Sequence, residues 1–172
     1  MVEKKQLVFD LRLNYNGPLS IEEFYAEVEK WMSEKGMQKD LKRKSEEVTS
    51  KGKTVEWIVE CWKSPVIDVK EVVRLRTLFG KVKEIKLKRK GRSITINHAD
   101  VLIVIDGFLE TKLRGRWTQK PLYSLFRTLY DKYVWAIGST ITERNEAPVA
   151  QDCYELHKRL KAFFSLYKMK VA

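Results

Sequence analysis

The sequence predicts an α+β protein, in which a curved antiparallel sheet of about six to seven strands packs against a long helix and an extra helix ends the chain. Apolar residues recur at every second position in several segments, which is typical of half-buried strands. They recur at helical spacing after the first of these segments and again towards the C-terminus. This order of elements favours an antiparallel sheet with helices on one face.

The first strand is predicted over residues 6–15, and a helix follows it. Residues 16–18, Asn-Gly-Pro, end the strand. Ser20 and Glu23 have the spacing of a capping box, which satisfies backbone N–H groups at a helix start. Gly36 is the expected stop. The apolar face of this strand is Leu7, Phe9, Leu11, Leu13 and Tyr15, and the apolar stripe of the helix is Phe24, Val28, Trp31 and Met32.

A run of strands comes next. Residues 38–48 are polar and basic, which predicts an exposed or edge strand, whereas residues 54–63 alternate clearly. Residues 71–79 scatter around a helical wheel but alternate well as a strand. Residues 81–90 continue the sheet, and a turn leads into a short strand at 93–97. The apolar set of the second of these strands is Val55, Trp57, Val59 and Cys61.

The segment 100–116 contains an Asp106-Gly107 pair, which is often a hairpin turn. A two-residue turn there would place charged residues on the apolar face, so we predict one long strand bent at Gly107. A helix over residues 119–137 follows and ends at Gly138. Together these elements make residues 1–137 a single domain.

Residues 138–148 are predicted to be a linker, and residues 149–172 an amphipathic helix. The apolar residues of that helix are spaced alternately by four and three, as in a coiled-coil seam: Val149, Cys153, Leu156, Leu160, Phe163 and Tyr167. Two interpretations stay open. The helix docks on the domain's own core, or residues 149–167 bind a protein partner or a second copy of the chain.

The layout of residues 5–137 resembles the helix-grip fold of the START-like, or polyketide-cyclase-like, superfamily. The long strand Asp100–Arg116 and the helix Pro121–Ile137 carry this resemblance. The chain departs from the family in having one helix after the first strand and a tail beyond residue 138. The resemblance implies an apolar ligand between sheet and helix, and it implies no catalytic residues. The ligand would contact Trp57, Val59, Leu75, Ile103, Ile105 and Leu109 of the sheet and Leu122, Phe126, Leu129 and Tyr133 of the helix.

The charge distribution is the other candidate for function. The net charge is +11, and residues 70–92 contain ten Lys and Arg residues but only two Glu. Side chains alternate along a strand, so Lys86, Lys88 and Lys90 stand in a row about 7 Å apart, which Arg74 and Arg76 are expected to extend. Such a row suits a phosphate backbone, because each neutralised phosphate releases counterions. The expected phosphate contacts are Arg74, Arg76, Lys86, Lys88, Arg89, Lys90 and Arg92. A solvated surface is the plainer interpretation of the same row.

The sequence shows no nucleophile motif, glycine-rich phosphate loop or metal-ligand spacing of Cys and His, so we expect no catalytic residue, metal or cofactor. Two cysteines and the lack of a long apolar run predict a cytoplasmic protein. The expected function is non-enzymatic binding of RNA, DNA or a ribonucleoprotein with little sequence specificity. The alternative is a START-like carrier or sensor of an apolar ligand. The basic row also leaves contact with an anionic membrane open.

Overall fold

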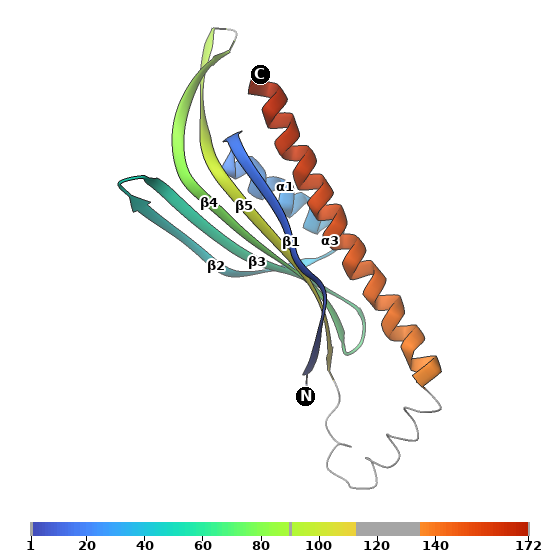
Figure 1. Cartoon of the computed structure of the whole chain (residues 1–172). Helices are drawn as coiled ribbons and strands as arrows, with labels where there is room; N and C mark the ends of the chain where they lie inside the picture. The colour runs from blue at the N-terminus through green and yellow to red at the C-terminus, as the bar shows by residue number, and fades with distance from the viewer. Residues whose placement is uncertain (1, 90, 113–134, 172) are drawn as a thin grey trace.

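The computed structural model describes residues 2–89, 91–112 and 135–171, and it confirms the α+β class (Figure 1). Its sheet has five antiparallel strands in the order β1-β5-β4-β3-β2. The elements are β1 (Val2–Leu19), α1 (Ile21–Glu34), β2 (Gln38–Thr49), β3 (Gly52–Val66), β4 (Val69–Arg89), β5 (Arg92–Lys112) and α3 (Trp135–Val171). Both helices pack on one face of the sheet, which we call the inner face; the other is the outer face.

The prediction of six to seven strands is wrong because two expected breaks are not breaks. The predicted strands 71–79 and 81–90 are one strand, β4, and the predicted strands 93–97 and 100–116 are joined in β5. At the first junction the register shifts between Gly80 and Lys83, and Lys81 has a φ of 51°. The chain therefore passes the Gly80 position through a β-bulge, with no turn.

The region from β1 to β3 follows the prediction closely. Ser20 caps α1 and accepts a hydrogen bond from the backbone N–H of Glu23, and Gly36 ends the helix with a φ of 63°. The predicted stripe of α1 is buried. The basic strand β2 lies at an edge of the sheet and is mostly exposed. The predicted apolar face of β3, Val55 to Cys61, is buried as well.

Strand β1 departs from simple alternation in its first half. Register shifts lie between Gln6 and Leu11, and Asp10 has a φ of 53°. The bulge directs Val8 into the core at 6% exposure and leaves Phe9 outside at 77%. The strand also continues through Pro18 instead of ending at Asn16. Because β1 is an edge strand, a proline without an N–H is tolerated there.

Helix α3 runs through the predicted linker. Residues 138–148 are helical, and both Gly138, the predicted helix end, and Pro148 lie inside α3. Isolated breakers cost free energy, but tertiary packing of the rest of a long helix outweighs that cost. Residues 119–134 of the predicted gripping helix lie outside the described residues. The sheet is instead covered by the following part of the chain, from Val149 onwards.

The seam of α3 is buried in the protein's own core, the first of the two interpretations. Val149, Cys153, Leu156, Leu160 and Tyr167 are at most 4% exposed. Phe164 is buried beside them, whereas the predicted Phe163 is partly buried. The helix approaches β5 closely at Gly107. A Cβ atom on Gly107 would lie 2.8 Å from Cys153 Sγ and 3.0 Å from Val149 Cγ1. The straight passage of β5 through Asp106-Gly107 is confirmed, and the glycine makes room for α3.

Candidate functional site

The far end of β4 and β5, residues 83–89 and 92–98, extends past the other strands, and we call it the ribbon; only at its base, at Asn97 and His98, does β1 still lie beside it. Strand β3 pairs with β4 only as far as Val82, and β1 reaches β5 only to Asn97. Beyond these points β4 and β5 pair only with each other, up to Arg89 and Arg92. At about 3.4 Å per residue the ribbon is roughly 20 Å long. Figure 1 shows it rising past the β2–β3 hairpin. We call the remainder of the sheet the sheet body.

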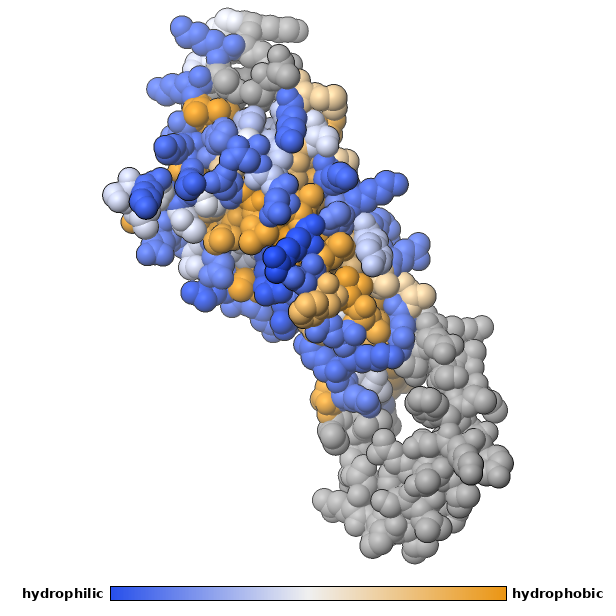
Figure 2. All heavy atoms as spheres, viewed as in Figure 1, coloured by the Kyte–Doolittle hydropathy of each residue, from blue (hydrophilic) through white to orange (hydrophobic). Residues whose placement is uncertain are grey.

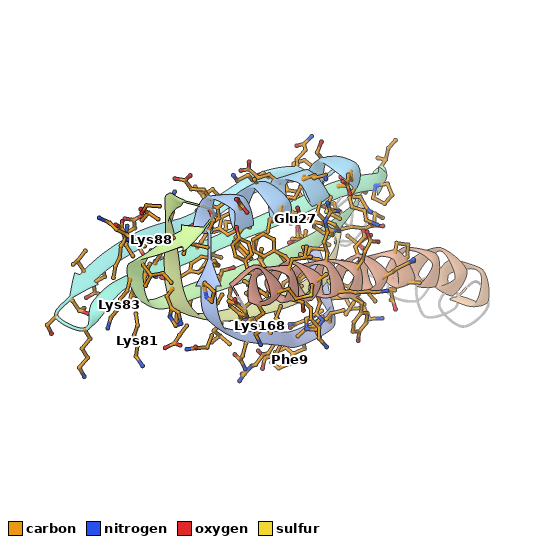
Figure 3. All side chains as sticks on the ribbon, turned by 90° about the horizontal axis from the view of Figure 1, so that it is seen from above. Phe9, Glu27, Lys81, Lys83, Lys88 and Lys168 are labelled. Atoms are coloured by element: carbon orange, nitrogen blue, oxygen red, sulfur yellow. The ribbon has the colours of Figure 1, made fainter. Side chains whose placement is uncertain are left out.

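The bulge at the base of the ribbon exchanges the two faces of β4. In the sheet body Arg74 and Arg76 lie on the outer face, where Arg74 is opposite Asp106. Val82, after the bulge, packs against the core, so Lys83 takes the outer face. Lys86 and Lys88 then extend from the inner face. Figure 3 shows Lys81, Lys83 and Lys88 at the same end of the sheet.

The predicted continuous row is therefore wrong. Arg74 and Arg76 do not extend the row of Lys86 and Lys88, because the bulge places the two pairs on opposite faces. Lys90 lies outside the described residues. Arg89 and Arg92 pair at the tip of the ribbon. Lys83 was not among the predicted phosphate contacts. The signal in the sequence was Gly80, because a glycine inside a strand often marks a bulge, and a bulge changes which face the following residues take.

In the sheet body six cations of the outer face have carboxylate partners, whereas Lys70 lies over the ring of Trp62. Arg74 Nη2 lies 2.6 Å from Glu60 Oε1, and Arg76 Nη2 lies 2.7 Å from Asp106 Oδ2. The Arg74 guanidinium also lies 5.0 Å from the ring centroid of Phe108. Further pairs join Lys42 to Glu60, Lys4 to Glu110, Arg12 to Asp10 and Arg43 to Glu56. Arg74 and Arg76 are thus engaged within the sheet and are poor candidates for phosphate contacts.

Two carboxylates anchor this network of ion pairs. Burial favours a higher pKa for Glu60, but hydrogen bonds from Arg74 and Lys42 outweigh it, and the pKa is below its ordinary value. The Asp106 side chain is only 3% exposed and accepts hydrogen bonds from the Asp10 backbone N–H and from Arg76. Figure 2 shows hydrophobic residues gathered on the face seen there among hydrophilic ones. Paired charges and apolar side chains thus lie side by side on this face.

The lysines of the ribbon have no such partners. Lys83, Lys86 and Lys88 are exposed, and none forms an ion pair within the described part of the chain. Glu84 is the one acidic residue of the ribbon. Lys81, at the base, lies 3.4 Å from Asp100 with its side chain 71% exposed. The ribbon therefore presents ammonium groups that are free to bind an anion.

The site of the alternative function is filled. All six predicted sheet residues, from Trp57 to Leu109, are at most 3% exposed and belong to the core. Phe24 of α1 packs edge-on against Trp57 at 6.1 Å between ring centroids, and α3 covers the neighbouring strand. The predicted helix residues Leu122, Phe126, Leu129 and Tyr133 lie outside the described residues. A hollow of about 510 Å³ lies instead on the outer face, beside Ile58, Arg74 and Arg76.

The cysteines and histidines of the described residues form no reactive or metal-binding group there. Cys61 and Cys153 are buried free thiols, and burial raises the pKa of each to about 12. His98 lies in β5 opposite Lys83. Among residues 2–89, 91–112 and 135–171, no three His, Cys, Asp or Glu side chains gather as metal ligands would.

No helix in the same ranges is long and apolar enough to cross a membrane. Comparisons with protein-family models, curated proteins and solved structures find no match.

Proposed function

We propose that the protein is a non-enzymatic nucleic-acid-binding protein whose β4–β5 ribbon contacts the phosphate backbone. One observation carries this proposal: the ribbon lysines are exposed and unpaired, whereas Arg74 and Arg76 of the same strand are ion-paired on the outer face. Like charges gathered without counter-charges repel one another, which costs stability. An anionic partner that neutralises Lys83, Lys86 and Lys88 removes this cost.

The chemistry of these side chains favours low sequence specificity. A lysine ammonium is a compact charge on a flexible stem, and it binds phosphate oxygens without reading the bases. Its binding free energy comes largely from counterion release, so affinity falls steeply as salt rises. The partner is a nucleic acid, free or within a ribonucleoprotein.

The test is fluorescence anisotropy with labelled mixed-sequence DNA and RNA over a salt series from about 50 to 200 mM. We expect binding that weakens steeply with salt. A triple variant, Lys83→Gln, Lys86→Gln and Lys88→Gln, should lower the slope of log K against log salt by about 0.9 for each phosphate that the variant no longer neutralises.

The matched control removes the same charge from the sheet body, with Lys39→Gln, Lys42→Gln and Lys53→Gln. These three lysines are ion-paired with Glu29, with Asp40 and Glu60, and with Glu46, respectively. The control should keep the wild-type slope. Equal slopes for all three proteins, or no binding at the lowest salt, would contradict the proposal.

The START-like carrier is the less supported alternative. Its sheet residues are buried under α1 and α3, so a ligand there would displace core side chains. We expect organic extraction of the purified protein, followed by mass spectrometry, to release no stoichiometric apolar compound. A stoichiometric compound would favour the carrier over the nucleic-acid-binding protein.

A further inference from the structure

We infer that the ribbon inserts into the major groove of duplex DNA, an inference that rests on the proposed function and names its substrate. Three features of the ribbon support it: free cations lie on both faces, its dimensions fit the groove, and its base is held by the sheet body. Each feature comes from β4 and β5 as they pair beyond the bulge.

The two-sided charge distinguishes insertion from binding on a flat platform. Lys83 lies on the outer face of the ribbon, while Lys86 and Lys88 lie on the inner face. A single strand lying across a sheet would meet the cations of one face only. An element that enters a groove has a phosphate backbone on either side, so cations on both faces find partners. Regular alternation along β4 after the bulge produces this arrangement, because three positions separate Lys83 from Lys86.

The size of the ribbon agrees with this mode. The major groove of B-DNA is about 12 Å wide and 8.5 Å deep, and it admits a two-stranded ribbon. Two paired strands lie about 4.8 Å apart. Opposite Lys86 and Lys88 stand Thr95 and Ser93, which are exposed and short, so the inner face is thin there. Their hydroxyl groups can bond to base edges without strong preference. The major groove of A-form RNA is too deep and narrow for such an element.

The base of the ribbon is fixed where it leaves the sheet body. Lys81 adopts a φ of 51°, and its backbone lies close to Gly52, where a Cβ atom would be 3.2 Å from Lys81 Cα. Lys81 Nζ lies 3.4 Å from Asp100 Oδ2 of the neighbouring strand. Beyond Asn97 neither β1 nor β3 flanks the strands, so both edges of the tip are unpaired. The ribbon is thus a projecting, preorganised element.

The experiment compares three labelled duplexes of one mixed sequence, each of about 20 base pairs, or two helical turns. They are plain DNA, DNA whose cytosines carry glucosylated hydroxymethyl groups that fill the major groove, and RNA. We expect plain DNA to bind roughly 10-fold more tightly than either of the others. Lys83→Gln and the double variant Lys86→Gln with Lys88→Gln should each lower the salt slope on plain DNA, because both faces contact phosphate.

The outcomes separate this inference from the proposed function. Equal affinity for plain and glucosylated DNA, or for DNA and RNA duplexes, would overturn insertion while salt-dependent binding left the proposed function standing. Insertion would also be overturned if the salt slope fell only in Lys83→Gln or only in the Lys86→Gln and Lys88→Gln variant. The absence of salt-dependent binding to every duplex would overturn both. The Lys39→Gln, Lys42→Gln and Lys53→Gln protein is the charge-matched control throughout.

Discussion

The sheet body and the ribbon use the same residue types in opposite ways, although β4 runs through both. In the sheet body, Arg74 and Arg76 each hold a carboxylate of a neighbouring strand. In the ribbon, Lys86 and Lys88 stand opposite Thr95 and Ser93, which carry no charge. The switch occurs within a few residues, at the Gly80–Lys83 bulge.

This difference shows that net charge alone does not locate a binding surface. A paired arginine is already satisfied, and recruiting it to a phosphate would leave its carboxylate partner without a counter-charge. An exposed, unpaired lysine gives up only hydration and bound counterions. The surface that matters is therefore one where neighbouring cations lack carboxylate partners, as Lys83, Lys86 and Lys88 of the ribbon do within the described residues.

The largest expected effect tests how closely α3 packs on the sheet body. Gly107→Ala places a methyl group 2.8 Å from Cys153 Sγ, so α3 must shift away from β5. We expect the free energy of unfolding to fall by about 3 kcal/mol, at the upper end of the cost of overpacking. Urea unfolding measures it. A change below about 0.5 kcal/mol would mean that α3 does not pack closely on β5.

The next effect tests whether the outer-face ion pairs are structural. Asp106→Ala removes the acceptor of the Asp10 N–H and the partner of Arg76. We expect a loss of about 2 kcal/mol in the free energy of unfolding. Asp106→Asn, which keeps an oxygen for the Asp10 N–H, should cost less. Equal losses for the two variants would show that the side-chain oxygens do not contribute.

Acid should weaken the same face by a smaller amount. The pKa of Glu60 is below its ordinary value of 4.5, so its pairing stabilises the folded state above that pH. The stabilisation is lost as the pH falls through the lowered pKa. Unfolding at a series of pH values should show that Glu60→Gln reduces this acid sensitivity by less than about 1 kcal/mol, because the pair is partly exposed. An unchanged pH profile in the variant would remove Glu60 from the network.

The smallest effect on stability is expected for the ribbon. The triple variant Lys83→Gln, Lys86→Gln and Lys88→Gln removes no ion pair within the described residues. Its free energy of unfolding should stay within about 0.5 kcal/mol of the wild-type value, or rise slightly as repulsion is relieved. A decrease near that of Asp106→Ala would erase the contrast between the two regions.

Local sequence signals predicted much of the fold. The Ser20 capping box, the Trp31 stripe and the alternation around Trp57 each depend on neighbours close in the chain, and each is confirmed. The seam from Val149 to Tyr167 was visible for the same reason. Its burial against the sheet was one of two interpretations, because periodicity shows that a face is apolar but not what covers it.

The errors arose where non-local contacts decide the conformation. Alternation assigns residues to faces by counting along the strand, and a bulge adds a residue to that count. Phe9 was therefore predicted on the apolar face but is exposed, and Lys86 was predicted on the same face as Arg76 but lies on the opposite one. Pro148 and Gly138 are local helix breakers, yet both lie within α3. Pairing of Arg74 with Glu60 could not be predicted from the sequence, since it depends on the register of β3 and β4.

Lysine footprinting tests most directly whether the unpaired lysines of the ribbon bind DNA. The protein is treated with an acetylating reagent with and without plain duplex DNA, and mass spectrometry reports the modification of each lysine. We predict that DNA protects Lys83, Lys86 and Lys88, while Lys39, Lys42 and Lys53 of the sheet body react to the same extent in both samples. Protection of the sheet-body lysines with an unprotected ribbon would contradict this assignment.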